Sequence, residues 1–232
     1  MFSRVNYNYI GKYFLSGSLR RDGSSRFGAD NRWGTFYSVG ASWIASKESF
    51  FNDISFVDLI KIRTSYGLTG NAAIGNFPSQ GLYVYGQDYD GTPGGSPSQL
   101  SNPNLTWEIQ NNFNLGLDFG FFNRVNGTVE YFNKTSSDLI LNVPISRTTG
   151  FNSLTQNFGE MKNSGVELSL NADIINNEDF NWNLGFNVTF LKNEITKLDE
   201  DFNSGRFRRQ VGEDFQSFYL FSWAGVNQTN GE

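Results

Sequence analysis

Apolar and polar residues alternate with period two along most of this chain of 232 residues. The clearest stretch is 33–43, where odd positions read Trp, Thr, Tyr, Val, Ala, Trp and even positions read Gly, Phe, Ser, Gly, Ser. Because successive side chains of a strand point to opposite faces, this pattern predicts a β-strand with one apolar face. The strand is long, since Trp33 and Trp43 lie ten positions apart, which is about 33 Å at a rise of about 3.3 Å per residue.

The same alternation recurs in six more segments of the chain. It predicts strands over residues 5–20, 60–69, 107–119, 125–131, 166–173 and 180–190. The aromatic segment 218–226 is a candidate for an eighth strand. The alternation also assigns side chains to faces: Trp107 joins the apolar face of its strand, whereas Phe36 joins the polar face of strand 33–43.

The connections between these strands alternate in length. Short links cover about residues 45–57, 122–124 and 175–179, and long ones cover about 21–31, 70–104, 136–159 and 192–217. Short turns at one end and long loops at the other are typical of an up-and-down antiparallel barrel in an outer membrane. A strand of about 33 Å tilted by about 40° would project to about 25 Å, the height of the apolar band on such barrels. The segment "RRDGSSRFGADNR" is then the shortest outer loop.

A soluble β-sandwich is the alternative, because its strands alternate in the same way. Average strands have only about 5–6 residues, whereas the predicted ones reach ten or more. A sandwich also gives no reason for loops that alternate between short and long. These features favour an all-β fold that forms part of an antiparallel transmembrane β-barrel.

The composition excludes several classes of function. The chain has no Cys and no His, so thiolate zinc sites, Cys nucleophiles and Ser-His-Asp triads are impossible. A net charge of −5 argues against nucleic acid as a partner, since nucleic-acid binders usually show a basic patch. No stretch approaches the roughly 18 apolar residues that a membrane helix needs. We place no paired acid and base either, so we expect no enzyme activity and no cofactor.

Six charged residues fall on the predicted polar faces, where a transport protein would have its lumen. They are Lys61, Arg63, Glu108, Asp118, Glu130 and Glu167. As lumen-facing charges they would tune passage or contact a domain that fills the barrel. The alternative is that they solvate a wet interior and pair across strands.

The long loop 70–104 carries the candidate ligand-binding residues. They are Tyr83, Tyr85 and Tyr89, next to Gln87, Asp88 and Asp90. Aromatic rings beside hydrogen-bonding groups suit the faces and hydroxyls of sugars. A loop that packs on itself is the alternative. The segments "DYDG" and "DEDFNSG" do not match the spacing of a calcium loop, so we expect no metal site.

Several stretches of the chain resemble the barrel of SusC/RagA-type TonB-dependent outer-membrane transporters. The resemblance covers nearly the whole chain in order, and it is carried by "RVNYNYIGKYFLSGSLRRDGSSRFG", "NRWGTFYSVGASW", "LIKIRTSYGLTGN", "LTWEIQNNFNLGLDFGFFNRVNGTVEYFNKTSSDLIL", "TTGFNSLTQNFGEMKNSGVELSL" and "FNWNLGFNVTFLKNEITKL". The element "RRDGSSRFG" is particularly characteristic of the family.

The resemblance implies a parent protein in the Gram-negative outer membrane. Its barrel would have 22 strands, of which this chain supplies seven or eight, and residues 1–232 would be an internal fragment without signal peptide, plug domain or terminal strands. The parent would import oligosaccharides, or sometimes peptides, together with a SusD-like lipoprotein, using TonB through the absent N-terminal part. The competing hypothesis from another class is a soluble or surface-anchored carbohydrate-binding β-protein; an outer-membrane enzyme is the weakest.

Overall fold

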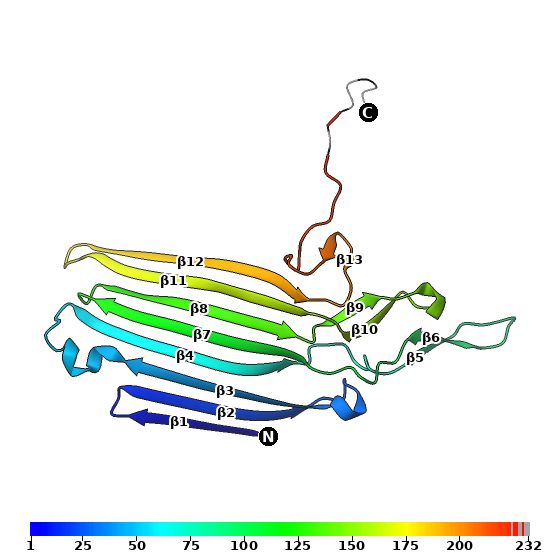
Figure 1. The fold of residues 1–232 in the computed structure, drawn as a ribbon, viewed down its shortest axis with the longest axis horizontal. Helices are drawn as coiled ribbons and strands as arrows, with labels where there is room; N and C mark the ends of the chain where they lie inside the picture. The colour runs from blue at the N-terminus through cyan, green and yellow to red at the C-terminus, as the bar shows by residue number, and fades with distance from the viewer. Residues whose placement is uncertain (224, 227–228, 230–232) are drawn as a thin grey trace.

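One antiparallel sheet of eight strands dominates the computed structural model, which describes residues 1–223, 225–226 and 229. Neighbours along the sheet follow the order of the chain, as in an up-and-down barrel wall (Figure 1). The strands are β1 (Phe2–Tyr9), β2 (Tyr13–Gly23), β3 (Trp33–Ile44), β4 (Val57–Asn71), β7 (Glu108–Phe121), β8 (Val125–Ser137), β11 (Glu160–Asn176) and β12 (Asn181–Lys197). Among the described residues the sheet does not close, so β1 and β12 are its edges. The predicted all-β, antiparallel class is therefore confirmed.

The predicted strand 5–20 is wrong, because it is a hairpin of two strands. Strands β1 and β2 pair from Phe2↔Arg20 to Tyr9↔Tyr13. Ile10 and Gly11 have φ of 46° and 66°, the two positive values of a tight hairpin turn. Residues Tyr9 and Tyr13 keep the same parity across the turn, so the alternation gives no sign that the chain reverses. A β-branched residue at positive φ is uncommon, which also hid the turn.

The predicted eighth strand at 218–226 is also wrong. Phe218 forms only an isolated bridge to Phe207, and none of the other described residues in this range lies in a strand. Ala224 lies outside the described residues. The count of eight is reached through the first hairpin instead.

The two ends of the sheet differ in their connections (Figure 1). Residues 10–12, 45–56, 122–124 and 177–180 join strands at one end, and residues 24–32, 72–107 and 138–159 join them at the other. Residues 45–56 form a longer link than 24–32, so the alternation of lengths rests on the other connections. The connecting elements are η1 (Ala29–Asn31), η2 (Ala45–Lys47), η3 (Ser49–Phe51), η4 (Arg147–Thr149), and the hairpins β5 (Leu82–Tyr85) with β6 (Gly95–Gln99), β9 (Ile140–Pro144) with β10 (Ser153–Asn157), and β13 (Phe202–Ser204) with β14 (Phe207–Arg209).

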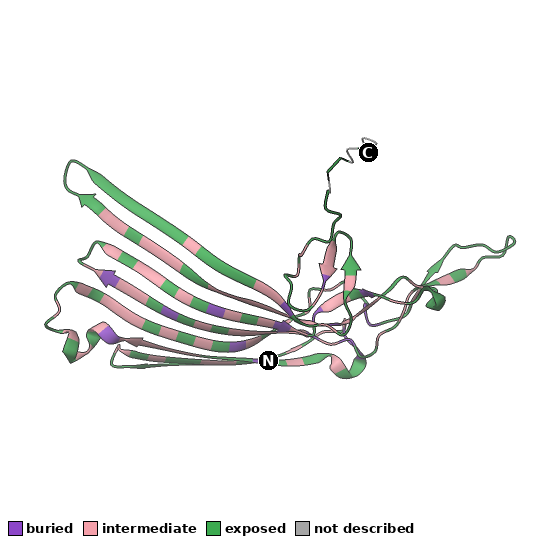
Figure 2. Cartoon of the chain, turned by 45° about the horizontal axis from the view of Figure 1, so that its top comes forward, coloured by how far each residue is buried: buried purple, intermediate pink, exposed green. Residues whose placement is uncertain are grey.

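Strand register separates an apolar face from a polar face. One row across seven strands reads Leu15, Ala41, Thr64, Leu115, Tyr131, Val166 and Phe190. The next row, on the other face, reads Ser16, Gly40, Ser65, Asn114, Phe132, Gly165 and Leu191. Burial changes along the inner strands, whereas β1 and most of β12, at the two edges, are exposed (Figure 2).

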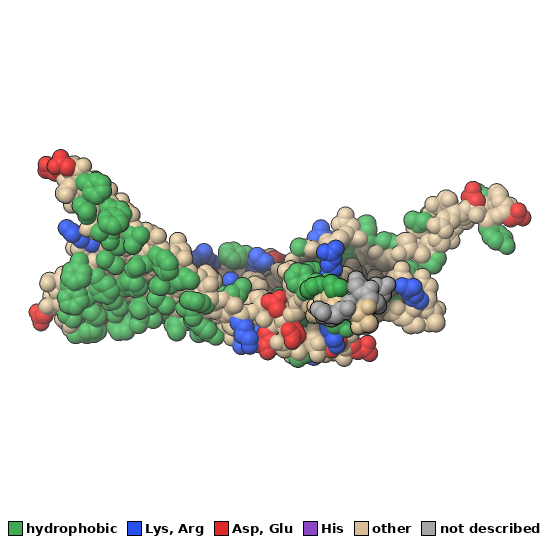
Figure 3. All heavy atoms as spheres, turned by 90° about the horizontal axis from the view of Figure 1, so that it is seen from above, with side chains coloured by type: hydrophobic (Ala, Val, Ile, Leu, Met, Phe, Trp, Pro, Cys, Tyr) green, Lys and Arg blue, Asp and Glu red, His purple; other side chains and the backbone are tan. Residues whose placement is uncertain are grey.

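No part of the described chain covers the apolar face. Val39 on β3 is 54% exposed and Leu184 on β12 is 49% exposed. Seen from above, hydrophobic side chains form a large patch over the strands, at the left of the view. Most of the charged side chains in this view lie nearer the long loops (Figure 3). An exposed apolar area of this extent marks a surface that contacts something other than water.

The main buried cluster lies at the loop end of the sheet, and it corrects one face assignment. Trp107 packs against Phe27 and Phe36, with ring centroids 4.8 and 5.4 Å apart. Leu105 completes the cluster and is fully buried. Trp107 was predicted on the apolar face, but it directly precedes β7 and packs against Phe36 instead. Phe36 does lie on the predicted polar face, where it pairs with Arg20, but it is buried there against the ring of Trp107.

Glu48 ties the connections at the opposite end together. Its carboxylate accepts hydrogen bonds from Lys12 Nζ at 3.0 Å, Tyr13 Oη at 2.7 Å and Trp43 Nε1 at 3.2 Å. Lys47 Nζ donates to the carbonyl of Gly11 at 3.0 Å. The turn after β1 is thereby attached to the connection after β3. Hydrogen bonds from Tyr13, Lys12 and Trp43 lower the pKa of Glu48 to about 2.

This attachment should depend on pH. A carboxylate whose pKa is lower in the folded state stabilises the fold above its ordinary pKa of about 4.3, and this contribution is lost as pH falls toward its folded pKa. We expect amide exchange in residues 10–12 of the purified protein to accelerate as pH falls from about 4.3 to about 2, beyond the intrinsic pH effect.

The variant Glu48→Gln should exchange quickly at every pH and lose this dependence. Asp53→Asn, in the same connection, is the matched control and should behave like the natural protein. Identical pH profiles for Glu48→Gln and the natural protein would contradict the assignment.

Candidate functional site

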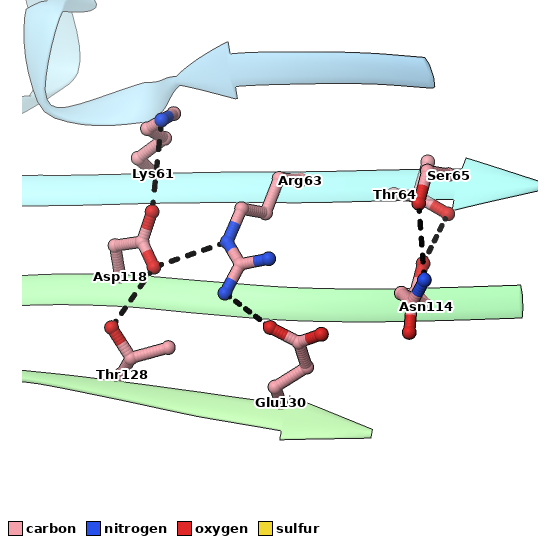
Figure 4. A network of polar contacts seen from close by, with 8 residues as sticks. All are labelled: Lys61, Arg63, Thr64, Ser65, Asn114, Asp118, Thr128 and Glu130. Atoms are coloured by element: carbon pink, nitrogen blue, oxygen red, sulfur yellow. Dashed lines mark hydrogen bonds and ion pairs between the residues drawn. The ribbon is translucent and has the colours of Figure 1, made fainter. Parts of the chain in front are cut away.

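A network of charges lies on the polar face where β4, β7 and β8 run side by side (Figure 4). Arg63 donates from Nε to Asp118 Oδ1 at 3.2 Å and from Nη2 to Glu130 Oε2 at 2.5 Å. Lys61 Nζ lies 3.7 Å from Asp118 Oδ2, and Thr128 Oγ1 donates to Asp118 Oδ1 at 3.1 Å. Two cations and two anions therefore share one connected set of contacts.

Strand register and one glycine place Arg63 at the centre of this network. Arg63 on β4 pairs with Gly116 on β7, and Gly116 pairs with Glu130 on β8. A Cβ atom at Gly116 would lie 2.7 Å from Arg63 Cζ. The guanidinium can therefore cross β7 and reach the third strand only because position 116 has no side chain.

The network is half-buried, and this burial determines how strongly its ion pairs hold one another. The side chains of Arg63, Asp118 and Glu130 are 34%, 22% and 23% exposed. Isolated surface ion pairs contribute only about 0–1 kcal/mol, but connected and partly desolvated groups hold one another in place. The arrangement has no nucleophile or open metal position; it is a fixed pattern of charge on a strand wall.

The structure brings together four of the six charges predicted for the polar faces: Lys61, Arg63, Asp118 and Glu130. Glu167 lies opposite Glu130 across β8 and β11, and it has no ion pair among the described residues. Glu108 lies apart at the loop end, where Asn71 Nδ2 is 3.5 Å from its Oε1.

The sequence analysis missed the role of Gly116. Its parity placed it on the polar face, but only the register shows that it lies beneath Arg63. The same face carries a hollow of about 420 Å³ beside the network, whose lining includes Arg63, Ser65 and Asn114.

The three predicted tyrosines lie on a hairpin that extends beyond the loop end of the sheet (Figure 1). Tyr83 and Tyr85 are on β5 and share one side of that strand. Tyr89 pairs with Thr92 around a turn in which Asp90 has a φ of 50°. The tyrosine side chains are 64%, 82% and 86% exposed, and Asp88 is exposed as well. The rings therefore form an accessible surface.

The base of the long loops is fixed by segment 102–107, which sequence reasoning missed. On one side, Gly28 N donates to the carbonyl of Leu105 at 3.1 Å. On the other side, the Asn157 side chain accepts from Thr106 N at 2.9 Å and donates to the Thr106 carbonyl at 3.0 Å. Asn102 Nδ2 adds a bond to the Thr155 carbonyl at 3.0 Å.

Loops 24–32, 72–107 and 138–159 are thus joined at their bases. The charged segment "RRDGSSRFGADNR" belongs to this joint: Arg26 Nη1 donates to the Ala72 carbonyl at 2.7 Å, and Phe27 is 1% exposed. The prediction of a simple outer loop therefore understated its role. It anchors the loop end of the sheet.

Residues 1–223, 225–226 and 229 contain no group of three or more acidic, His or Cys residues that could hold a metal ion. None of the helices in the described part of the chain has the length and apolar character needed to cross a membrane.

The position of Arg63 can be tested through Gly116. Replacing Gly116 with Ala should push the guanidinium away from Glu130, because the new Cβ would overlap it. In a double-mutant cycle with Arg63→Gln and Glu130→Gln, the coupling should be on the order of 1 kcal/mol in the natural background and near zero in the G116A background. Unfolding of the purified protein by denaturant is the measurement.

Gly120→Ala is the matched control, since it lies on the same strand and face. There a Cβ would meet only ordinary contacts, the nearest being Leu59 Cβ at 3.4 Å. Equal coupling in the G116A and natural backgrounds would show that Arg63 reaches Glu130 without needing the space left by Gly116.

Nearly the whole chain matches a known barrel family. The family of TonB-dependent receptor-like β-barrels matches residues 1–227. A TonB-dependent receptor of Formosa agariphila is 40% identical over 231 residues, which cover 98% of this chain and 22% of that protein. The TonB-dependent receptor SusC of Bacteroides thetaiotaomicron is 39% identical over 246 residues, covering 95% of this chain and 24% of SusC.

Solved structures show the same relationship. The RagAB peptide transporter matches with a TM-score of 0.90 at 36% identity, over 97% of this chain and 26% of that chain. The chain therefore spans about a quarter of the length of the relatives it matches. From the family match over residues 1–227 and the similarity to SusC and RagAB, this chain belongs to the TonB-dependent receptor β-barrel family and is of the SusC/RagA type.

Proposed function

We propose that these strands form part of the wall of an outer-membrane barrel in an active transporter of Gram-negative bacteria. The observation that carries the proposal is the two-faced sheet: an uncovered apolar face on one side and the Arg63 network on the other. The apolar face would contact lipid, and the polar face, with all six charges from Lys61 to Glu167, would line the lumen. Free sheet edges are not tolerated in hydrocarbon, so the edges β1 and β12 would pair with further strands of a wider barrel.

The competing function, a soluble carbohydrate-binding β-protein, needs a second layer over the apolar face. Within the described residues no such layer exists, and Val39 and Leu184 remain exposed. The membrane wall accounts for this exposure without any additional element.

The energy and partners of the transporter follow from its family. A SusC/RagA-type transporter would draw energy from the TonB complex, through a segment outside these residues, and would work with a SusD-like surface lipoprotein. RagAB is described as a peptide importer. For this protein we favour oligosaccharides, because the exposed tyrosines beside carboxylates offer apolar ring faces to sugars and hydrogen-bond acceptors to their hydroxyls. The chain itself would contribute binding and passage, with no catalysis.

The assignment of faces gives a direct test in the full-length transporter. Val39→Arg and Leu184→Arg should each destabilise the folded barrel by about 2–4 kcal/mol, because a charge would enter hydrocarbon. Ser38→Arg and Asn183→Arg are the neighbouring controls on the polar face and should have little effect. Heat-modifiability on gels measures the folded fraction. Equal damage from both pairs would contradict the membrane wall.

The tyrosines test the choice of substrate. Replacing Tyr83, Tyr85 and Tyr89 together with Ala should weaken binding of the cognate oligosaccharide by roughly tenfold or more, and by on the order of a hundredfold if every ring contributes about 1 kcal/mol. Replacing the same residues with Phe keeps the rings and should retain most of the affinity. Calorimetric titration of the full-length transporter measures both. Unchanged affinity in the folded triple Ala variant would leave the hairpin without a role in binding.

A further inference from the structure

The uncovered apolar face is not uniform, because a trough runs along it over β1 to β4. Two adjoining hollows, of about 630 and 270 Å³, share Val5, Gly17 and Val39 in their linings. The larger continues to Ala41 and Thr64, and the smaller extends toward the loop end.

The trough exists because side chains along its floor are small. Register places Gly17 between Val5 and Val39, and the row continues to Tyr66. A Cβ at Gly17 would find only the Ser38 carbonyl oxygen within 4 Å, at 3.9 Å. The floor is therefore open space on the membrane side, bordered by larger apolar side chains.

A cation lies beyond the loop end of the trough. Arg21 follows Leu19 on the same face of β2, and Leu19 lines the smaller hollow. The Arg21 guanidinium lies 5.4 Å from the ring of Trp33. Arg21 is exposed and has no ion pair or side-chain hydrogen bond among the described residues, whereas its neighbour Arg20 is paired with Asp22 at 2.6 Å.

The spacing between this cation and the far end of the trough fits one lipid leaflet. Six residues separate Arg21 from Leu15, whose row contains Ala41 and Thr64. They extend about 20 Å along the strand at about 3.3 Å per residue. At a tilt of about 40° this spans about 15 Å of membrane depth, half of the roughly 30 Å hydrocarbon core.

We propose that this trough holds an acyl chain of a phosphate-bearing membrane lipid whose headgroup binds Arg21. Guanidinium groups bind phosphate through paired hydrogen bonds. Trp residues such as Trp33 are enriched at membrane–water interfaces. The Arg21–Trp33 pair supplies the charge that selects the headgroup, and the open floor at Gly17 accepts the chain. The inference rests on the proposed membrane wall, because only there does this face meet lipid.

Native mass spectrometry of the full-length transporter in detergent tests the site, with dioleoyl phosphatidylglycerol and the phosphate-free dioleoylglycerol as probes. The natural protein should retain phosphatidylglycerol better than dioleoylglycerol. Arg21→Gln should reduce retention of phosphatidylglycerol roughly tenfold, to the level of dioleoylglycerol. Gly17→Leu should reduce retention of both lipids, because its side chain fills the trough without a backbone clash.

Two controls separate the site from general effects. Arg206→Gln removes a cation outside the eight-stranded sheet, and Ala172→Leu enlarges a side chain of β11, outside the trough; both should retain lipid normally. Unchanged phosphatidylglycerol retention in either Arg21→Gln or Gly17→Leu overturns the proposal.

Heat-modifiability on gels distinguishes a failure of the lipid-site proposal from a failure of the proposed membrane wall. Both site variants should remain heat-modifiable and competent for uptake, since neither residue lies on the polar face. A protein with no heat-modifiable form in any variant would instead refute the membrane wall.

Discussion

The in-register pairing of eight antiparallel strands is the constraint on which the rest of this structure depends. Because side chains alternate with period two, a shift of one residue in any pair would exchange its faces. The register keeps Leu15, Ala41, Thr64 and Leu115 in one row and Ser16, Gly40, Ser65 and Asn114 in the next. One continuous apolar surface and one continuous polar surface follow from this pairing, and so do the Arg63 network and the trough over β1 to β4.

Glycines adapt the wall on both of its faces. On the polar face, Gly116 lets Arg63 reach across a strand to Glu130. On the apolar face, Gly17 opens the floor of the trough. A strand gains little stability from glycine, which has no side chain to pack. Each leaves open a space that a side chain would fill: Arg63 occupies the space at Gly116, and the space at Gly17 is the floor of the trough.

The two ends of the sheet are held by different physical means. At the short-turn end, the Glu48 carboxylate gathers Lys12, Tyr13 and Trp43, so charge-assisted hydrogen bonds join two connections. At the loop end, buried rings around Leu105 and the amide of Asn157 join three loops. The tyrosine hairpin rises from this packed base yet remains exposed, which combines a fixed position with an accessible surface.

The sequence by itself determined the class of fold, most strand positions and the face of most side chains. These depend on period two and on strand length, which are local properties of the chain. The first hairpin was missed because Ile10 and Gly11 reverse the chain without changing parity. Trp107 was misplaced because parity does not describe a residue outside its strand.

Only the tertiary structure decided which residues meet. Lys61, Arg63, Asp118 and Glu130 share a face by alternation, but their contacts depend on pairing between β4, β7 and β8. The contacts among three loops at Leu105 and the row from Val5 through Gly17 to Val39 likewise join residues that are distant in sequence. Periodicity restricts register to shifts that keep the faces matched, but it does not say which residue of the next strand lies opposite, and therefore it could not place these groups side by side.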